Sequence, residues 1–451
     1  MESVGETPSQ RGEADALSSL RASASPPPGK SGGGKPANEP AQVYAVLADG
    51  RDGQVLPRRV DPQEPGAYHR ELDDNGEGEE DDAMSQAVDA SSDQLAAFHL
   101  LLLRMSGRLP DGLICACRRW LAEGEIVEIA QAVLFGALAG RVPMTDDDAH
   151  LLSGTLADAG EETDALADIE RVLIDPQPLY GLAPVSPQEL AEHGDRVPYS
   201  IDLTVPYDGP GAADETDHTA VATVRAQCEE GAPLRALWRA WRFPTMEARW
   251  PPPRRIYLLQ ADAEAALPAL AAGLQDALEL VGESDPQVEV FRDADELPAY
   301  QRTALGFSTL LWTATPAVAP LVARVYDIFD PQLGPGFDPA HSRIEGEERD
   351  RVLSYLGEGA PLLITATRSP DVVDPTAGEV VPTGFFTDGR WIWTEAVAYY
   401  LRVYGLAPDP DMLDAIRAQG YLPPDVDTAA LHRALSTLYS PLAEPAEPVA
   451  D

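Results

Sequence analysis

Apolar residues recur at helical spacing between residues 92 and 173, and a polar cap or a glycine marks the ends of most runs. The first run is “SSDQLAAFHLLLLRMSG”, in which a serine stands before the apolar residues and a glycine after them. Later runs are “PDGLICACRRWLAEG”, “EIVEIAQAVLFGALAG” and “TDDDAHLLSGTLADAG”, where Thr145 and Asp148 have capping-box spacing. Because the connections are short, the helices should pack antiparallel, and we predict a small helical bundle over residues 91–173.

Beyond residue 174 the apolar spacing changes to a period of two, which is typical of half-buried strands. The runs “RRIYLLQ” and “PQVEVF” predict two further strands with an Ala- and Leu-rich helix between them. Pro268 either kinks this helix or lies in its first turn. We predict an α/β domain over residues 174–325, with parallel pairing inferred from the connection length. The alternating positions are Tyr199, Ile201, Leu203, Val205 and Tyr207.

The last part of the pattern predicts a C-terminal α+β module over residues 326–440. It contains the helix “ERDRVLSYLGEG”, the strand “PLLITAT” and the aromatic stretch “TDGRWIWTEAVAYYLRVYG”. A two-residue Asp388-Gly389 turn would pair Phe386 with Trp391, and Gly384 with Trp393, so that Gly384 leaves room for the indole. Thr394 would then cap a helix that ends at Gly405.

The aromatic stretch has two interpretations. Core packing explains it fully and is preferred, because the aromatic side chains fall on one face of the hairpin and on one stripe of the helix. The alternative is a ligand or peptide groove in which Trp391, Trp393 and Tyr399 present polar N–H and O–H groups.

Both ends of the chain differ in composition from the folded part. Residues 1–90 contain “SASPPPGKSGGGKP” and “ELDDNGEGEEDD” but few large apolar side chains, so they predict a disordered acidic tail. Residues 441–451 predict a second disordered tail. The predicted fold class is therefore α+β: a disordered N-terminal tail, a small helical bundle, an α/β domain and a C-terminal hairpin–helix module.

Charge limits the choice of partners. The formal net charge is -42, from 75 acidic against 33 basic residues, so nucleic acid and anionic membranes should be repelled. No apolar run has the length of a membrane span, and the N-terminus does not resemble a signal peptide. Three cysteines suit a reducing compartment. These features predict a cytoplasmic protein.

One segment is locally basic. Between residues 234 and 257, Arg235, Arg239 and Arg242 would share one face of a helix, and Arg254 and Arg255 follow. Such a cluster could bind an anionic partner, and the acidic tail could mask it. The preferred alternative is an arginine face that carboxylates neutralise within the fold.

Candidate catalytic residues are few. Cys115 and Cys117 do not share a helix face and predict small buried thiols. His341, with Asp327, Asp330 and Asp338 nearby, could form a base or a cation site, although Asp and Pro are also ordinary turn residues. No nucleotide, zinc-protease or serine-hydrolase fingerprint is present. The sequence predicts no metal site and no cofactor.

Two stretches carry a resemblance. “DELPAYQRTALGFSTLLW” and “FFTDGRWIWTEAVAYYLRVYGLAPDPDML” resemble uncharacterised actinobacterial proteins with a T-D-G-x-W-x-W segment and a Tyr-Tyr helix. The resemblance covers at most the last two thirds of the chain and implies a cytoplasmic bacterial protein, without an activity.

The sequence therefore favours a regulatory or adaptor protein that binds another protein. The alternative is an enzyme with a cleft between the α/β domain and the C-terminal module. A deep cleft that contained His341, Asp371 or Asp388 would favour the enzyme.

Overall fold

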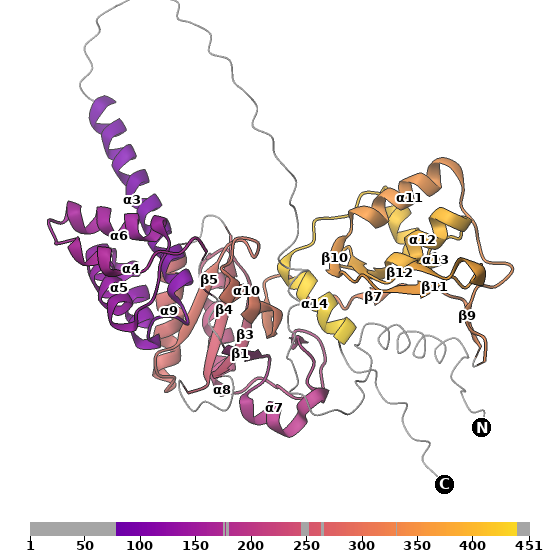
Figure 1. The fold of residues 1–451 in the computed structure, drawn as a ribbon, viewed down its shortest axis with the longest axis horizontal. Coiled ribbons are helices and arrows are strands. Elements are labelled where there is room, and N and C mark those ends of the chain that lie inside the picture. Colours follow the sequence, from indigo (N-terminus) through magenta and orange to yellow (C-terminus); the bar gives the residue numbers. More distant parts are fainter. Residues whose placement is uncertain are drawn as a thin grey trace, which may run out of the picture.

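The computed structural model describes residues 78–174, 176, 180–244, 252–262, 266–330 and 332–439. Within them, helices come first, a central sheet follows, and a smaller sheet with its own helices comes last (Figure 1). The fold is thus a mixture of helix and sheet, as the pattern predicts. The predicted tails at residues 1–77 and 441–451 lie outside the described residues, whereas residues 78–90 belong to the first helix.

The bundle contains the predicted helices. Its hydrophobic core includes Phe98, Ile114 and Leu152, none of which is exposed. Thr145 begins the last long helix, and its hydroxyl accepts a hydrogen bond from the Asp148 amide, as expected. The elements are α3 (Gly78–Met105), α4 (Asp111–Glu123), α5 (Ile126–Gly140), α6 (Asp146–Asp158) and the short η1 (Asp164–Asp168).

The central sheet has the strand order β2-β6-β3-β4-β5, with β1 beside one end of β3. Strands β4 and β5 are parallel, as predicted, and α9 joins them. Pro268 lies in the first turn of α9, so it does not kink the helix. The strands are β1 (Tyr180–Ala183), β2 (Ile201–Asp202), β3 (Leu234–Pro244), β4 (Arg254–Ala261), β5 (Gln287–Phe291) and β6 (Ser308–Thr313). The helices are α7 (Pro187–His193), η2 (Gly194–Arg196), α8 (Glu215–Glu229), α9 (Leu267–Leu280) and α10 (Ala299–Gly306).

Two predictions of secondary structure are wrong. The Arg- and Trp-rich segment is the central strand β3 and not a helix. It hydrogen-bonds to β4 along one edge and to β6 and β1 along the other, which satisfies its backbone polar groups. The strand predicted around Tyr199–Tyr207 is reduced to the two residues of β2.

Helices cover both faces of the central sheet. Leu237 and Leu259 pack against α8 and α9 on one face. Trp238 and Leu258 pack with residues of α10 and with Ala429 of the last helix on the other. Helices α3 and α4 approach the free edge of β5, where His99 donates a hydrogen bond to the Val290 carbonyl at 2.8 Å. The bundle and the sheet are therefore joined through buried contacts.

The C-terminal part contains a four-stranded sheet of order β10-β13-β14-β7. Helices α11, α12 and α13 pack over one face, and the last helix, α14, packs over the other. The strands are β7 (Leu321–Val322), β8 (Ile328–Asp330), β9 (Gly334–Gly336), β10 (Ala360–Leu363), β11 (Arg368–Pro370), β12 (Glu379–Pro382), β13 (Phe385–Thr387) and β14 (Trp391–Thr394). The helices are α11 (Gly346–Glu358), η3 (Pro375–Ala377), α12 (Glu395–Tyr404), α13 (Pro410–Ala418) and α14 (Thr428–Tyr439).

The aromatic hairpin forms, but in a different register. Phe386 lies opposite Trp393, and Thr387 lies opposite Ile392, so the turn is longer than two residues. Asp388 explains the difference, because its carboxylate accepts hydrogen bonds from the amides of Arg390 and Trp391 and stabilises the wider loop.

Candidate functional site

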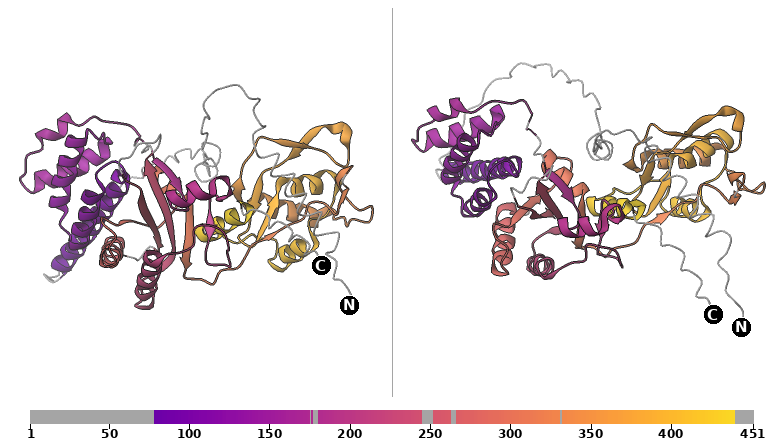
Figure 2. Two further views of the ribbon diagram at one scale, coloured as in Figure 1. Left: turned by 90° about the horizontal axis from the view of Figure 1, so that it is seen from below. Right: turned by 60° about the horizontal axis from the view of Figure 1, so that its bottom comes forward.

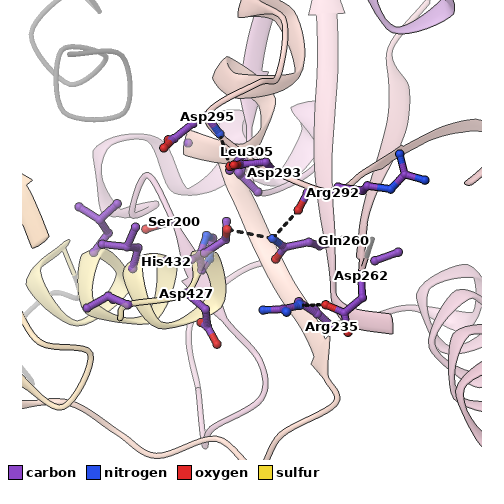
Figure 3. A pocket seen from close by; sticks show the side chains of 17 residues that line it. Ser200, Arg235, Gln260, Asp262, Arg292, Asp293, Asp295, Leu305, Asp427 and His432 are labelled. Atoms are coloured by element: carbon purple, nitrogen blue, oxygen red, sulfur yellow. Dashed lines mark hydrogen bonds and ion pairs between the residues drawn. The ribbon is translucent and has the colours of Figure 1, made fainter. Parts of the chain in front are cut away.

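A pocket of about 440 Å³ lies between the central sheet and α14 (Figure 3). Its walls come from the carboxyl ends of β4 and β5, the end of α10, and one side of α14. In α/β sheets, ligands commonly bind where parallel strands end. Helix α14 also packs on the C-terminal sheet, so both sheets meet at this helix (Figures 1 and 2). This pocket is the candidate site.

Gln260 at the end of β4 forms part of the buried floor. Its Nε2 atom lies 3.0 Å from the Arg292 carbonyl and 3.2 Å from the Thr428 hydroxyl (Figure 3). A carbonyl oxygen can only accept, so this orientation of the amide is fixed by the hydrogen bond. Both amide hydrogens are then used, and the Oε1 atom remains as an acceptor.

His432 of α14 is buried beside Gln260. Its Nε2 atom donates to the Ile201 carbonyl at 2.9 Å, and its ring contacts Trp238 edge to face. Burial lowers the pKa of His432, which outweighs the opposite effect of the Ile201 carbonyl. The ring is therefore neutral at pH 7, with its proton on Nε2 and an acceptor lone pair on Nδ1.

Ser200 lines the same pocket and is only 2% exposed. Its Oγ atom has no hydrogen-bond partner within the part of the chain that the structure describes. A buried hydroxyl without a partner is costly, so this atom is a candidate for contact with a ligand or water.

The rim of the pocket carries most of its charge. Asp262 pairs with Arg235, and Asp427 accepts the Ala430 amide at the start of α14. Asp293 accepts the Asp295 amide at 2.9 Å. Among the described residues, Asp293, Asp295 and Asp427 form no ion pair, which leaves three carboxylates at the entrance.

Most of the predicted arginine cluster is used inside the fold. The side chains of Arg239, Arg242 and Arg255 are 3%, 1% and 7% exposed. They form ion pairs with acidic residues that begin helices: Asp217 in α8, Asp111 in α4, and Asp214 at the cap of α8. These three arginines therefore do not form an exposed basic patch, which corrects the prediction of a shared helical face.

The remaining two arginines lie apart. Arg254 contacts Ser284 and Asp285 near the start of β4. Arg235 lies at the other end of β3 and lines the pocket. The structure thus brings only Arg235 of the five to the candidate site.

The predicted aromatic residues lie in the C-terminal module and outside the pocket. Trp391 and Trp393 are buried in the core between the small sheet and its helices. The Tyr399 hydroxyl donates to the Asp371 carboxylate at 2.9 Å. A role in recognition stays a prediction for these three residues, and their observed contacts are those of core packing.

Asp371, Asp388 and His341 have local partners. Burial raises the pKa of Asp371, but hydrogen bonds from Tyr404, Tyr399 and nearby amides lower it on balance. Asp388 accepts the Tyr355 hydroxyl at 2.5 Å, and His341 contacts Asp327 at 2.7 Å and the Ala407 carbonyl at 2.9 Å. None of the three lines the pocket.

Burial raises the pKa of Cys115 to about 11 and that of Cys117 to about 12, so both thiols stay protonated at pH 7. Both are buried, in agreement with the sequence. No group of three or more His, Cys, Asp or Glu in the described ranges is placed to hold a metal ion. No described helix has both the length and the apolar character to cross a membrane.

Sequence reasoning missed this pocket. Asp262 directly after β4 and “RDAD” after β5 were an available signal, because polar residues at the ends of parallel strands often face a ligand. No local signal connects them to His432, which is more than a hundred residues away.

Comparison of the chain with protein-family models, with curated proteins and with solved structures finds no match. The resemblance to actinobacterial proteins therefore stays a prediction, and the pocket itself is the basis for a function.

Proposed function

We propose that the chain is a cytoplasmic bacterial regulatory or adaptor protein, and that the pocket between the central sheet and α14 receives part of a protein partner. The observation that carries the proposal is the position of α14. One side of this helix lines the pocket, and the same helix packs against Leu362, Phe385 and Ile392 of the C-terminal sheet. A bound segment would therefore contact the helix that joins the two sheets.

The alternative of an enzyme finds less support. A cleft that contained His341, Asp371 or Asp388 would favour the enzyme, and these residues lie elsewhere with local hydrogen-bond partners. The pocket has instead a buried polar floor and a charged rim, which suits recognition of a protruding group.

The proposal can be tested by filling the pocket. Ala294 lines it, is half-buried in the loop before α10 and also packs against the core that contains Trp238 and Leu297. Ala294→Trp should therefore fill the pocket, and its melting temperature shows whether that core is kept. Ala157→Trp on the exposed side of α6 is the matched control. Each tagged full-length variant would be used for cross-linking and affinity purification from the native host, after its melting temperature is checked.

We expect the wild type and Ala157→Trp to retain the same partner, and Ala294→Trp to lose it. Equal capture by all three proteins would contradict the pocket as the binding site. A wild type that captures nothing above a tag-only control would contradict the adaptor function.

A further inference from the structure

We propose that the pocket binds the guanidinium group of an arginine side chain on the partner. This inference rests on the proposed function and deepens it, because it names the group that enters. It follows from three independent features of the pocket: the acceptors of its floor, the charge of its rim and the apolar part of its walls.

The floor offers acceptors. The hydrogens of the Gln260 amide are bound to Arg292 and Thr428, which leaves Oε1. The His432 ring donates through Nε2 to Ile201, which leaves Nδ1. Ser200 adds a buried hydroxyl that has no partner among the described residues. A ligand that suits these atoms must bring several donors, and guanidinium carries five N–H donors and no acceptor.

The rim favours a cation. Four aspartates line the pocket against two arginines. Arg235 is already paired with Asp262, while the carboxylates of Asp293, Asp295 and Asp427 have no ion pair in the described part of the chain. The neutral form of His432 adds no positive charge. The local field therefore attracts a positive group toward the floor.

The walls between rim and floor are partly aliphatic. Leu431 and Leu435 of α14, Leu305 of α10 and Ala294 all line the pocket. An arginine side chain has three methylene groups that can pack on such a surface while the charged head reaches polar atoms beyond it. A compact inorganic cation would leave this apolar surface without contact, so the shape favours a side chain.

An anionic ligand would need free positive charge at the site. Arg235 is engaged by Asp262, Arg292 is not free either, and three carboxylates lie at the entrance. A phosphate or an acidic peptide would be repelled by these carboxylates, and its binding would overturn the inference.

The test compares two capped pentapeptides, Gly-Gly-Arg-Gly-Gly and the same peptide with citrulline. Citrulline has nearly the shape of arginine but no charge, because a carbonyl oxygen, which can only accept, replaces one of the two NH2 donor groups. Binding to the full-length protein would be measured by ligand-observed NMR and calorimetry at low and high salt. We expect the arginine peptide to bind at least about tenfold more tightly, since charge-assisted hydrogen bonds are lost with citrulline.

Variants locate the binding. Asp293→Asn with Asp295→Asn removes two exposed rim charges, and Asp158→Asn with Glu161→Gln removes two exposed charges from the bundle as the matched control. We expect the rim variant to weaken arginine-peptide binding several-fold, by about three- to tenfold at low salt and less at high salt. The control variant should bind like the wild type.

Each other outcome has a distinct meaning. Equal binding of both peptides, or equal binding by the rim variant and the wild type, overturns the inference. Binding of agmatine but not of the arginine peptide overturns the assignment to a partner's side chain and identifies a free guanidinium compound. If neither peptide binds while Ala294→Trp still loses the captured partner, the guanidinium inference fails and the proposed function stands.

Discussion

At the scale of single residues, Trp393 shows how the aromatic hairpin is packed. Its side chain is 1% exposed, lies in the core with Tyr355 and Val397, and stacks at a tilt on Tyr355. The glycine that makes room for the indole is Gly359, at the end of α11, and not Gly384 as the sequence suggested. A Cβ atom at Gly384 would instead meet the Glu395 carboxylate.

Gly359→Ala should therefore destabilise the protein although its backbone allows alanine. The φ angle of Gly359 is -59°, so the cost comes from overlap of the new methyl group with the Trp393 ring. We expect a loss of about 1–3 kcal/mol in the free energy of unfolding. Gly357→Ala, two residues earlier in α11, meets no atom within 4 Å and should stabilise the protein by about 0.5–1 kcal/mol. Urea denaturation of the two variants gives both values; similar effects from the two would contradict this account.

Trp393→Ala tests whether the aromatic cluster is a core or a binding surface. Removal of a fully buried indole should lower the free energy of unfolding by about 3–5 kcal/mol, because the cavity can collapse only in part. Leu422→Ala, at a side chain that is 71% exposed, should change it by less than about 0.5 kcal/mol. If Trp393→Ala melted like the wild type but lost its captured partner, Trp393 would be a recognition residue.

Local rules succeeded where the chemistry is local. The Thr145 cap and the end of α12 at Gly405 follow from neighbouring residues and agree with the structure. For Pro268 the sequence left a kink and a first-turn position open, and the structure has the first-turn position. Thr394 occupies the predicted cap position, but its side chain makes no capping hydrogen bond. The hairpin register depended on Asp388, whose side chain competes with the short turn.

At the scale of elements, β3 explains the largest error in the sequence interpretation. A central strand that is buried on both faces shows no alternation of apolar and polar residues. Two register shifts along β3 disturb the period further. Its arginines happen to have helical spacing. The segment is a strand because it pairs with β4 and β6, which the local sequence does not reveal.

Two arginines of β3 connect the central sheet to helices by ion pairs. Arg239 reaches Asp217 of α8, Arg242 reaches Asp111 of α4, and both aspartates lie at the start of their helices. Acidic residues are favourable at helix N-termini, so each ion pair also stabilises a helix end. Neutralised arginines, the preferred interpretation of the sequence, agree with these ion pairs, but the partners could not be assigned without the tertiary structure.

The contact of α3 with β5 should make the protein sensitive to mild acid. Burial lowers the pKa of His99 to about 4, despite the hydrogen bond to the Val290 carbonyl, and Arg118 and Arg292 act in the same direction as burial. The unfolded chain would bind a proton near pH 6.5, whereas the folded chain would not bind one until about pH 4. The contribution of His99 is therefore complete above about pH 6.5 and is lost as the pH falls toward 4.

The variant His99→Gln keeps a neutral donor and removes this titration. Between pH 7 and 4 we expect the wild type to lose about 2–3 kcal/mol more of its free energy of unfolding than His99→Gln does. His150→Gln changes an exposed histidine of α6 and should follow the wild type. Parallel stability curves for His99→Gln and the wild type would show that His99 does not titrate in this way.

At the scale of the whole molecule, α14 holds the two sheets together. Arg433 pairs with Asp202 of β2 at 2.9 Å, and His432 binds the Ile201 carbonyl of the same strand. Ala434 of the same helix packs into the C-terminal sheet. The sequence predicted a boundary between two domains, but it gave no signal that the final helix would return to β2, because these partners lie 231 residues apart.

Variants of the Asp202–Arg433 pair test how much the junction between α14 and β2 contributes to the free energy of unfolding. Its side chains are 2% and 10% exposed, so Asp202→Asn or Arg433→Gln leaves one charge buried and should cost about 3–5 kcal/mol. The double variant should cost less than the sum, with a coupling of at least about 1 kcal/mol. The exposed Arg349–Asp350 pair is the control and should couple by less than about 1 kcal/mol.

Hydrogen exchange shows which elements are destabilised. Each single variant should speed exchange in β2 and in β13–β14, while α5 and α6 stay protected. Additive effects in the cycle, or faster exchange limited to β2, would mean that the two sheets do not depend on α14 for their association.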